Sequence, residues 1–391
     1  MKKLPLDNLT VIEFSHMVMG PSAGLILADL GAKVIKVEPI GGDKTRKLEG
    51  SGAGYFAMYN RNKQSICVDV KSKEGREIIK KLAKTADVVI ENFRQGALDK
   101  LGIGYEELSA INSELIFLSA KGFLHGPYEN RTALDEVVQM MGGLAYMTGP
   151  SGQPLRAGAS VIDVMGGMFG VIAILAALAQ RQDTGAGEHV KSSLFESTAF
   201  LMGQHIAQGA ITGQAAKPMP ERISAWAIYD VIDIRDGDKI FLAVVSDSQW
   251  VNFCNEFELQ EFIGNQDLVT NAQRVLQRET ILDVVTCAFK QFDLNELSER
   301  LDRVGLPYAT INKPEDLLDD QHMLESGGLI DVELNDGTTA KLPALPVEFS
   351  NEKFGLRRAI PSVGEHTTSV LDDIGYSDQE ISILRKRGVL A

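Results

Sequence analysis

The chain has 391 residues, 44% hydrophobic and 24% charged, a length that predicts two domains rather than a single core. The formal net charge is −14, from 39 Lys+Arg against 53 Asp+Glu, which argues against a nucleic-acid or anionic-membrane surface. Any anionic ligand must therefore meet a local group of cations.

Three cysteines, Cys67, Cys254 and Cys287, lie far apart and lack any CxxC spacing. They fit a reducing compartment and predict neither a disulfide framework nor a zinc site. The N-terminus has no signal-peptide pattern, so we expect a cytoplasmic protein. The longest uncharged run, residues 164–180, is short for a membrane span and has no aromatic belt, and we interpret it as a helix buried on all sides.

The first half of the chain alternates strand-like and helix-like segments. We expect strands at Thr10–Phe14, Ala32–Glu38, Ser65–Val70, Asp87–Glu91 and Leu115–Ser119, and helices at Pro21–Leu30 and Ser72–Lys84. This alternation predicts an α/β fold with a mostly parallel sheet and helices on both faces, a large doubly wound, Rossmann-like domain.

The pattern changes after this half. An apolar helix is expected over Val161–Gln180, followed by a strand at Glu188–Leu194 and a helix at Phe195–Ala210. Residues 211–224 resemble a linker. An Asp236–Gly237 hairpin then opens a segment with a different texture.

These segments predict a domain plan. Residues 1–210 form the large domain, 225–313 an inserted smaller α+β domain, and 314–391 a return segment that completes the large domain. The return segment contains a helix beginning at Pro314, a second hairpin at Asp336–Gly337, and a tail helix with Ser377 as N-cap and Glu380 three residues on.

Two common enzyme classes are disfavoured. The first strand–turn–helix unit reads SHMVMGP, with one glycine, whereas a dinucleotide pyrophosphate requires several. No GxSxG is present, and the six histidines show no catalytic or metal-ligand spacing. These patterns disfavour a nicotinamide-dependent oxidoreductase and a Ser–His–Asp hydrolase, and they provide no metal-ligand spacing.

Asp163 is the one charge at the edge of the apolar run. From position alone, a helix-capping or first-turn acid is the favoured interpretation. A catalytic carboxylate would instead need room for a ligand, which Gly158, Gly166 and Gly167 are expected to supply. Since the ordinary pKa of an aspartate is about 3.9, we expect Asp163 to be ionised without an adjacent base. Position alone leaves both interpretations open.

Six collinear segments show a family resemblance. The chain resembles the class III CoA-transferases, which include formyl-CoA transferase and carnitine CoA-transferase, over nearly its whole length. The similar segments are 20–38 (GPSAGLILADLGAKVIKVE), 60–77, 86–102, 161–167 (VIDVMGG), 176–196 and 370–390.

The resemblance implies a mechanism and an assembly. Asp163 would attack an acyl-CoA thioester and pass through a mixed anhydride to an aspartyl-CoA thioester, which the acceptor acid reverses. Backbone N–H groups of the turn Met17–Met19 would stabilise the oxyanions. Acyl-CoA and a carboxylic acid are the implied substrates, without a metal or redox cofactor, and the implied assembly is an interlocked homodimer.

The resemblance also implies CoA contacts by position. Val18 and Met19 would flank the thioester, with His16 nearby. The adenine, phosphate and pantetheine regions would then meet Ile40, Val68, Asp69, Val70, Lys71, Asn92, Phe93, Arg94, Lys100, Thr132, Ala133, Leu134 and Asp135. The cations among them suit a polyphosphate on an otherwise acidic protein.

Departures from the family pattern narrow the substrate. Oxalate-handling members carry a glutamine where this chain has Val18, a tyrosine–glutamate pair where it has Leu134–Asp135, and a glycine-rich flap absent near Val245–Ser248. A larger or less polar acid is therefore favoured. Since members of the resembling family often use a dicarboxylate, the resemblance suggests one such as succinate.

Two alternatives stay open. An α-methylacyl-CoA racemase would need a histidine just before Asp135, where Leu134 stands. A non-catalytic acyl-CoA-binding protein would need Asp163 to be only a helix cap.

Overall fold

The computed structural model describes residues 3–222, 224–334, 336–350 and 352–391. Residue 223 of the predicted linker and residue 335 of the predicted second hairpin thus lie outside the described residues. The chain divides into two compact units, Met1–Pro220 with Gln321–Ala391, and Glu221–Asp320.

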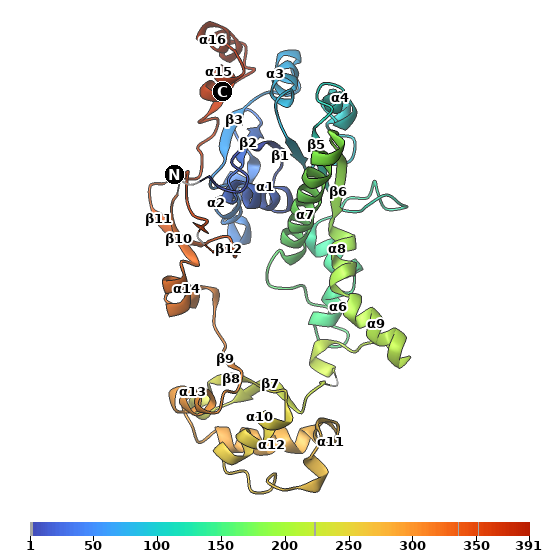
Figure 1. Cartoon of the computed structure of the whole chain (residues 1–391), viewed down its shortest axis with the longest axis vertical. Helices are drawn as coiled ribbons and strands as arrows, with labels where there is room; N and C mark the ends of the chain where they lie inside the picture. The colour runs from blue at the N-terminus through green and yellow to red at the C-terminus, as the bar shows by residue number, and fades with distance from the viewer. Residues whose placement is uncertain (1–2, 223, 335, 351) are drawn as a thin grey trace. The chain divides into compact units, whose positions relative to one another are not determined.

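A six-stranded parallel sheet forms the centre of the first unit (Figure 1). Its strands are β1 (Thr10–Phe14), β2 (Lys33–Glu38), β3 (Gln64–Cys67), β4 (Val88–Glu91), β5 (Ile116–Lys121) and β6 (His189–Ser193). They are arranged in the order β3-β2-β1-β4-β5-β6, all neighbours parallel. This is the Rossmann order, in which the chain changes direction across the sheet between β1 and β4. The predicted parallel α/β sheet is confirmed.

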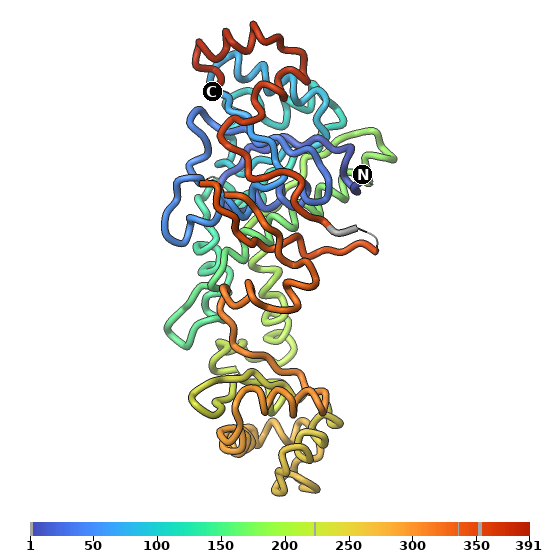
Figure 2. The backbone as a smooth tube through the Cα atoms, turned by 90° about the vertical axis from the view of Figure 1, so that its left-hand side faces the viewer, coloured from blue at the N-terminus to red at the C-terminus, as the bar shows by residue number. Residues whose placement is uncertain are grey.

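Helices cover both faces of this sheet because alternate strand residues are apolar on each side. On one face, Val11, Val34 and Ile90 pack against α1 (Met19–Asp29) and α7 (Val161–Thr184). On the other face, Ile12, Ile35 and Val89 share a core with the remaining covering helices, α3 (Lys73–Ala83), α4 (Tyr105–Ser109), α15 (Thr367–Asp373) and α16 (Asp378–Lys386). Figure 2 shows the C-terminal helices beside α3, so the two ends of the chain build one core.

Glycines let α1 and α7 approach closely. A Cβ added at Gly166 would lie 2.7 Å from Met19 Cε, and one at Gly167 would lie 2.7 Å from the Met19 carbonyl oxygen and against Ser22. Gly158, by contrast, has no atom within 4 Å of such a Cβ. The expectation that Gly166 and Gly167 make room for a ligand is therefore wrong, because their space is filled by α1.

The expectation that α7 is buried on all sides is also wrong for this chain. Gly170, Val171 and Ile174 are buried, but Met168 is 49% and Ile172 58% exposed. By length and composition alone α7 is long and apolar enough to cross a bilayer, a test that core helices of soluble proteins also pass. Here the face of α7 that carries its glycines packs on α1 and the sheet. A continuous apolar helix packed on one side leaves an unpartnered face.

The helix expected at Phe195–Ala210 is two helices, α8 (Leu194–Leu201) and α9 (Gly203–Thr212). The break falls at Met202 and Gly203, and glycine weakens a helix at such a junction. The first unit also contains α2 (Tyr55–Tyr59), α5 (Asp135–Met141), α6 (Leu144–Thr148), α14 (Gln321–Ser326), the strands β12 (Glu348–Phe349) and β13 (Glu352–Lys353), and the hairpin β10 (Leu329–Glu333) with β11 (Thr339–Pro343). Its 3-10 turns are η1 (Lys44–Lys47), η2 (Gly50–Gly52), η3 (Asp99–Leu101) and η4 (Met219–Glu221), of which the last crosses into the second unit.

The second unit has an antiparallel sheet and its own apolar core. Its strands β7 (Ile228–Asp233) and β8 (Lys239–Val244) form the predicted hairpin, with Asp236 and Gly237 in the left-handed region, and β9 (Tyr308–Thr310) pairs with β8. Its helices are α10 (Asp247–Glu256), α11 (Asn271–Leu276), α12 (Arg278–Phe289) and α13 (Leu294–Arg303), and its 3-10 turns are η5 (Arg235–Gly237), η6 (Gln266–Leu268) and η7 (Pro314–Leu318). In the first unit, the predicted tail cap is confirmed, since Ser377 and Glu380 form a capping box at α16.

The α1–α7 packing predicts the effect of a single methyl group. Gly167→Ala should destabilise the first unit by up to about 2 kcal/mol, because an overpacking cost of about 1–3 kcal/mol is offset by a gain of about 1 kcal/mol in helix propensity. Thermal unfolding followed by circular dichroism would report this as a lower midpoint. Gly158→Ala is the matched control and should leave the midpoint unchanged; equal midpoints for the two variants would contradict the packing argument.

Candidate active site

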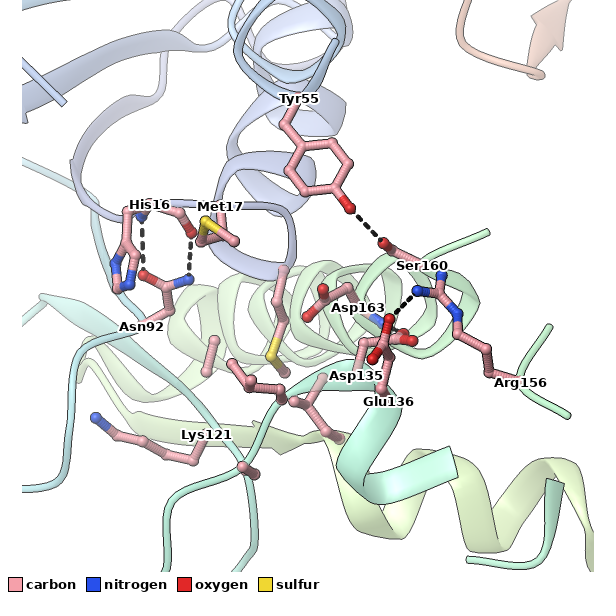
Figure 3. Close-up of a pocket in the computed structure, with 16 residues that line it drawn as sticks. His16, Met17, Tyr55, Asn92, Lys121, Asp135, Glu136, Arg156, Ser160 and Asp163 are labelled. Atoms are coloured by element: carbon pink, nitrogen blue, oxygen red, sulfur yellow. Dashed lines mark hydrogen bonds and ion pairs between the residues drawn. The ribbon is translucent and has the colours of Figure 1, made fainter. Parts of the chain in front are cut away.

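A cavity of about 310 Å³ opens at the carboxyl edge of the sheet, within the first unit (Figure 3). Crevices beyond the carboxyl ends of the strands are where ligands bind in open α/β sheets. The cavity is lined by His16, Met17, Met19, Tyr55, Asn92, Ala120, Lys121, Gly122, Ala133, Leu134, Asp135, Glu136, Arg156, Ser160, Asp163 and Leu194.

The start of α7 is capped by another helix. The backbone N–H groups of Ile162 and Asp163 donate to one carboxylate oxygen of Asp135, at 2.9 and 3.0 Å. Gln139 donates to the other oxygen of Asp135 and accepts from the N–H of Ala157 at 2.9 Å. From its position in the sequence, Asp163 was expected to cap this helix. In the structure Asp135 caps it instead.

The Asp163 side chain is consequently free of a capping duty. Its carboxylate has no hydrogen-bond or ion-pair partner among the described residues, and Figure 3 shows it directed into the cavity. Burial, and then the nearby Asp135 carboxylate, raise the pKa of Asp163 to about 7. The expectation of an ordinary, fully ionised aspartate is therefore wrong, because loss of solvent outweighs the favourable field of the helix start.

The turn between β1 and α1 forms another wall of the cavity. Met17 adopts a left-handed conformation (φ 63°), and its N–H donates to Thr45 Oγ1 at 3.0 Å. Asn92 accepts from the N–H of His16 at 3.0 Å and donates to the carbonyl oxygen of His16 at 2.8 Å. A non-glycine residue in this region persists only where its surroundings hold it.

This geometry changes the expected oxyanion donors. The Met17 N–H is occupied by Thr45. The N–H groups of Val18, Met19 and Gly20, at the start of α1, have no acceptor within the part of the chain that the structure describes, so Val18 and Met19 of the expected turn stay available. They are the groups that an oxyanion can still engage.

Buried charges hold the turn from below. Lys36 donates to the carbonyl oxygen of Ser15 at 2.8 Å and forms an ion pair with Asp43 at 3.1 Å. Asp43 in turn accepts from Thr45. Lys63 pairs with Glu13 at 2.8 Å, and burial, partly offset by Glu13, lowers the pKa of Lys63 to about 8. Lys36, Lys63 and Glu13 have fully buried side chains.

His16 stands at the cavity edge as a neutral ring. It stacks on Phe93 with ring centroids 5.5 Å apart. Burial lowers the pKa of His16 below its ordinary value, against the raising effect of Asp43. At neutral pH the ring is an uncharged neighbour of the site.

The structure brings together a subset of the predicted residues. Those lining the cavity are Asp163, His16, Met19, Asn92, Ala133, Leu134 and Asp135. Val18 and Val68 are buried in the core beneath, while Ile40, Lys71, Arg94, Lys100 and Thr132 are exposed outside the cavity. Asp69, Val70 and Phe93, partly buried, also lie outside it. Most of these outer residues follow β2, β3 and β4, at the same carboxyl edge, and their contact with CoA stays a prediction.

Several lining residues were not predicted. Arg156 and Ser160 precede Asp163 closely in the sequence, so a search of the polar residues leading into the apolar helix would have found them. Tyr55 and Lys121 come from distant segments, and no sequence signal connects them to Asp163. Burial and Asp163 together raise the pKa of Tyr59, one turn beyond Tyr55, which places Tyr59 within the field of the same carboxylate.

Comparison with known proteins identifies the family. The model for "CoA-transferase family III" matches residues 6–367. The chain belongs to CoA-transferase family III. The match spans the sheet, the turn at His16 and the start of α7, so every residue that lines the cavity falls within the family's matched region.

The sequences of curated relatives align with this chain over nearly its full length. The succinate–glutarate CoA-transferase of Agrobacterium fabrum is 33% identical over 95% of this chain and 96% of its own. The human succinyl-CoA:glutarate CoA-transferase is 31% identical over 99% and 90%. Among solved structures, a CAIB/BAIF family protein from Brucella suis has a TM-score of 0.84 and 33% identity, covering 95% of this chain and 100% of that one.

The raised pKa of Asp163 predicts a pH-dependent stability. Because the folded protein holds this proton more tightly than the unfolded chain (ordinary value 3.8), stability falls as pH rises from about 4 to about 7 and changes no further above that range. Asp163→Asn removes this loss. Its thermal midpoint should exceed that of the wild type by more at pH about 8 than at pH about 5, and the difference should disappear toward pH about 4. A variant that is less stable than the wild type at both values would show instead that the folded protein stabilises the ionised carboxylate.

Proposed function

We propose that this family III CoA-transferase moves CoA between carboxylic acids through a covalent intermediate on Asp163. The supporting observation is that Asp135 caps α7, which leaves the Asp163 carboxylate unpaired and directed into the cavity. A carboxylate placed in this way is suited to attack rather than to structural pairing.

The reaction consists of two exchanges and their reversal. An Asp163 oxygen bonds to the thioester carbonyl carbon, the C–S bond breaks, and a mixed anhydride and CoA thiolate result. The thiolate bonds to the Asp163 carbonyl carbon, the anhydride C–O bond breaks, and the donor acid leaves with one oxygen that came from Asp163. An acceptor carboxylate then attacks the aspartyl-CoA thioester, and the same two steps in reverse yield the new acyl-CoA.

The environment of Asp163 supports this chemistry. A carboxylate whose pKa is near 7 is a stronger nucleophile than an ordinary aspartate, and a useful fraction of it is ionised at neutral pH. The N–H groups of Met19 and Gly20 are our proposed donors to the tetrahedral oxyanions. These steps exchange acyl groups between carboxylates and a thiolate, and none of them requires a metal ion or a redox cofactor.

The proposed substrates are an acyl-CoA and a dicarboxylic acid of the succinate or glutarate kind, since the relatives' names contain these acids. CoA would extend from the cavity along the carboxyl edge, where Lys71, Arg94 and Lys100 are exposed. These lysines and this arginine would meet its phosphates. A cytoplasmic setting belongs to the same proposal and is supported by three unpaired thiols.

A homodimer is also part of the proposal. The helices α7, α8 and α9 of the first unit each expose apolar side chains, namely Met168, Ile172, Leu175, Phe200, Ile206 and Ile211. A second copy of the chain would cover these side chains. Light scattering should return twice the chain mass for the wild type, and Ile172→Glu should lower it. Ile383→Glu, at an exposed position of α16, is the control. A monomeric wild type would overturn the dimer.

The covalent step predicts a trapped residue. Incubation with succinyl-CoA followed by hydroxylamine should modify Asp163, as mapped by mass spectrometry of its peptide. Asp163→Ala should lower transfer by at least about a thousandfold. Asp183→Ala removes an exposed acid at the other end of α7 and should change neither result.

Two outcomes would overturn the proposal. One is labelling at a different residue with no label on Asp163, and the other is full transfer by Asp163→Ala. The racemase alternative is tested by solvent deuterium, whose rapid entry at the α-carbon of a 2-methylacyl-CoA without CoA transfer would favour proton exchange instead.

A further inference from the structure

The cavity has two chemically different sides around Asp163. Figure 3 shows His16, Asn92 and Lys121 on one side, and Tyr55, Ser160 and Arg156 on the other. The first side adjoins the strand ends where the proposed CoA contacts lie. The second side is formed by α2 and by the segment that leads into α7. The acyl group must therefore extend toward the second side.

Arg156 is the cation that a ligand in this cavity can engage. Among the described residues that line it, Lys121 and Arg156 carry positive charge. Lys121 is committed elsewhere, because its Nζ pairs with Glu91 at 2.5 Å and donates to the carbonyl oxygen of Phe93 at 2.8 Å, with the side chain 9% exposed.

The pairing of Arg156 is of a different kind. Its Nη1 pairs with Glu136, whose side chain is 60% exposed, and its Nε donates to the carbonyl oxygen of Ala157 at 3.0 Å. Nη2 has no acceptor in the described part of the chain. Exposed ion pairs contribute little to stability because water screens them, so a ligand carboxylate can replace Glu136 at little cost.

Two hydroxyl groups lie beside this arginine. Tyr55 Oη and Ser160 Oγ are 3.4 Å apart, and each can donate a hydrogen bond. The other ionisable groups on this side, Asp163, Asp135 and Glu136, are carboxyl groups. An anion on this side can therefore bind favourably only at the Arg156 guanidinium and the hydroxyl groups of Tyr55 and Ser160.

We propose that Arg156, with Tyr55 and Ser160, binds the second carboxylate of a dicarboxylic acyl group whose reacting carbonyl lies at Asp163. The inference rests on the proposed function and names the residues that select its substrate. The planar guanidinium matches a carboxylate with two parallel hydrogen bonds, which a methyl group in the same place cannot accept. Arg156 thus distinguishes succinyl from butyryl groups, which differ in this terminal group.

The test compares the first half-reaction for these two thioesters. Wild type and Arg156→Gln are each incubated with succinyl-CoA or with butyryl-CoA, and the rate of hydroxylamine-trapped Asp163 is measured by mass spectrometry. Arg156→Gln should reduce the succinyl-to-butyryl ratio of labelling rates by roughly 10–100-fold, the effect of losing hydrogen bonds between charged groups. The butyryl-CoA rate should fall much less than the succinyl-CoA rate, and circular dichroism should show that the variant is folded.

Two further variants complete the design. Arg156→Lys keeps the positive charge but loses the planar guanidinium that can donate two parallel hydrogen bonds. Its succinyl-to-butyryl ratio should therefore lie between those of the wild type and Arg156→Gln. Arg387→Gln removes an arginine from an exposed ion pair with Glu74, outside the cavity, and should leave the ratio as in the wild type. An equal loss of both rates in Arg156→Gln, or an unchanged ratio, would overturn the assignment of Arg156. Absence of label on wild-type Asp163 with both thioesters would instead overturn the proposed function, and this inference with it.

Discussion

The geometry of the site depends on the carboxylate of Asp135, which receives the first backbone N–H groups of α7. A helix start leaves such N–H groups unpaired, and the nearest acid on the same helix would ordinarily satisfy them. Here the cap comes from the first turn of α5, and Gln139 fixes its orientation. Helix α7 thereby positions Asp163, while the side chain of Asp163 is not used to cap the helix.

The same arrangement has an electrostatic consequence. Two carboxyl groups near one helix start repel each other, and burial disfavours charge on Asp163, whose carboxylate accepts no hydrogen bond in the described part of the chain, so its pKa rises to about 7. A structural acid would gain nothing from this shift. A nucleophile gains basicity while keeping an ionised fraction, which is the balance that acyl transfer at neutral pH requires.

The turn opposite Asp163 is fixed by buried charge rather than by glycine. Lys36 joins the carbonyl oxygen of Ser15 to Asp43, and Asp43 positions the Thr45 hydroxyl that holds Met17 in its left-handed conformation. Removing one partner from such a network leaves an uncompensated buried charge. This explains how a turn with bulky side chains serves where dinucleotide-binding folds use glycines.

Much of the fold was predictable from local pattern, and much of the site was not. Alternating apolar segments sufficed for the parallel sheet, because strands covered on both faces are apolar throughout. Asp163 stood out as the charge beside an apolar run. The residue that caps α7 lies 28 residues before Asp163, on α5, and the Tyr55–Ser160 contact spans 105 residues, so neither has a local signal.

The errors of the sequence-based predictions also come from tertiary structure. Gly166 and Gly167 were expected to face a ligand, but tertiary packing places α1 against them. The ionisation of Asp163 was expected from its ordinary pKa, since a sequence does not show how far a side chain is removed from water.

The central claim, that Asp163 carries the CoA during transfer, is tested most directly by following oxygen during turnover. In the proposed steps, an oxygen of the acceptor carboxylate stays on Asp163 when the new acyl-CoA leaves. With an acceptor acid labelled with the heavy isotope of oxygen, the peptide containing Asp163 should gain the isotope, as should the released donor acid in later cycles. Formation of the new acyl-CoA while Asp163 stays unlabelled would contradict the account.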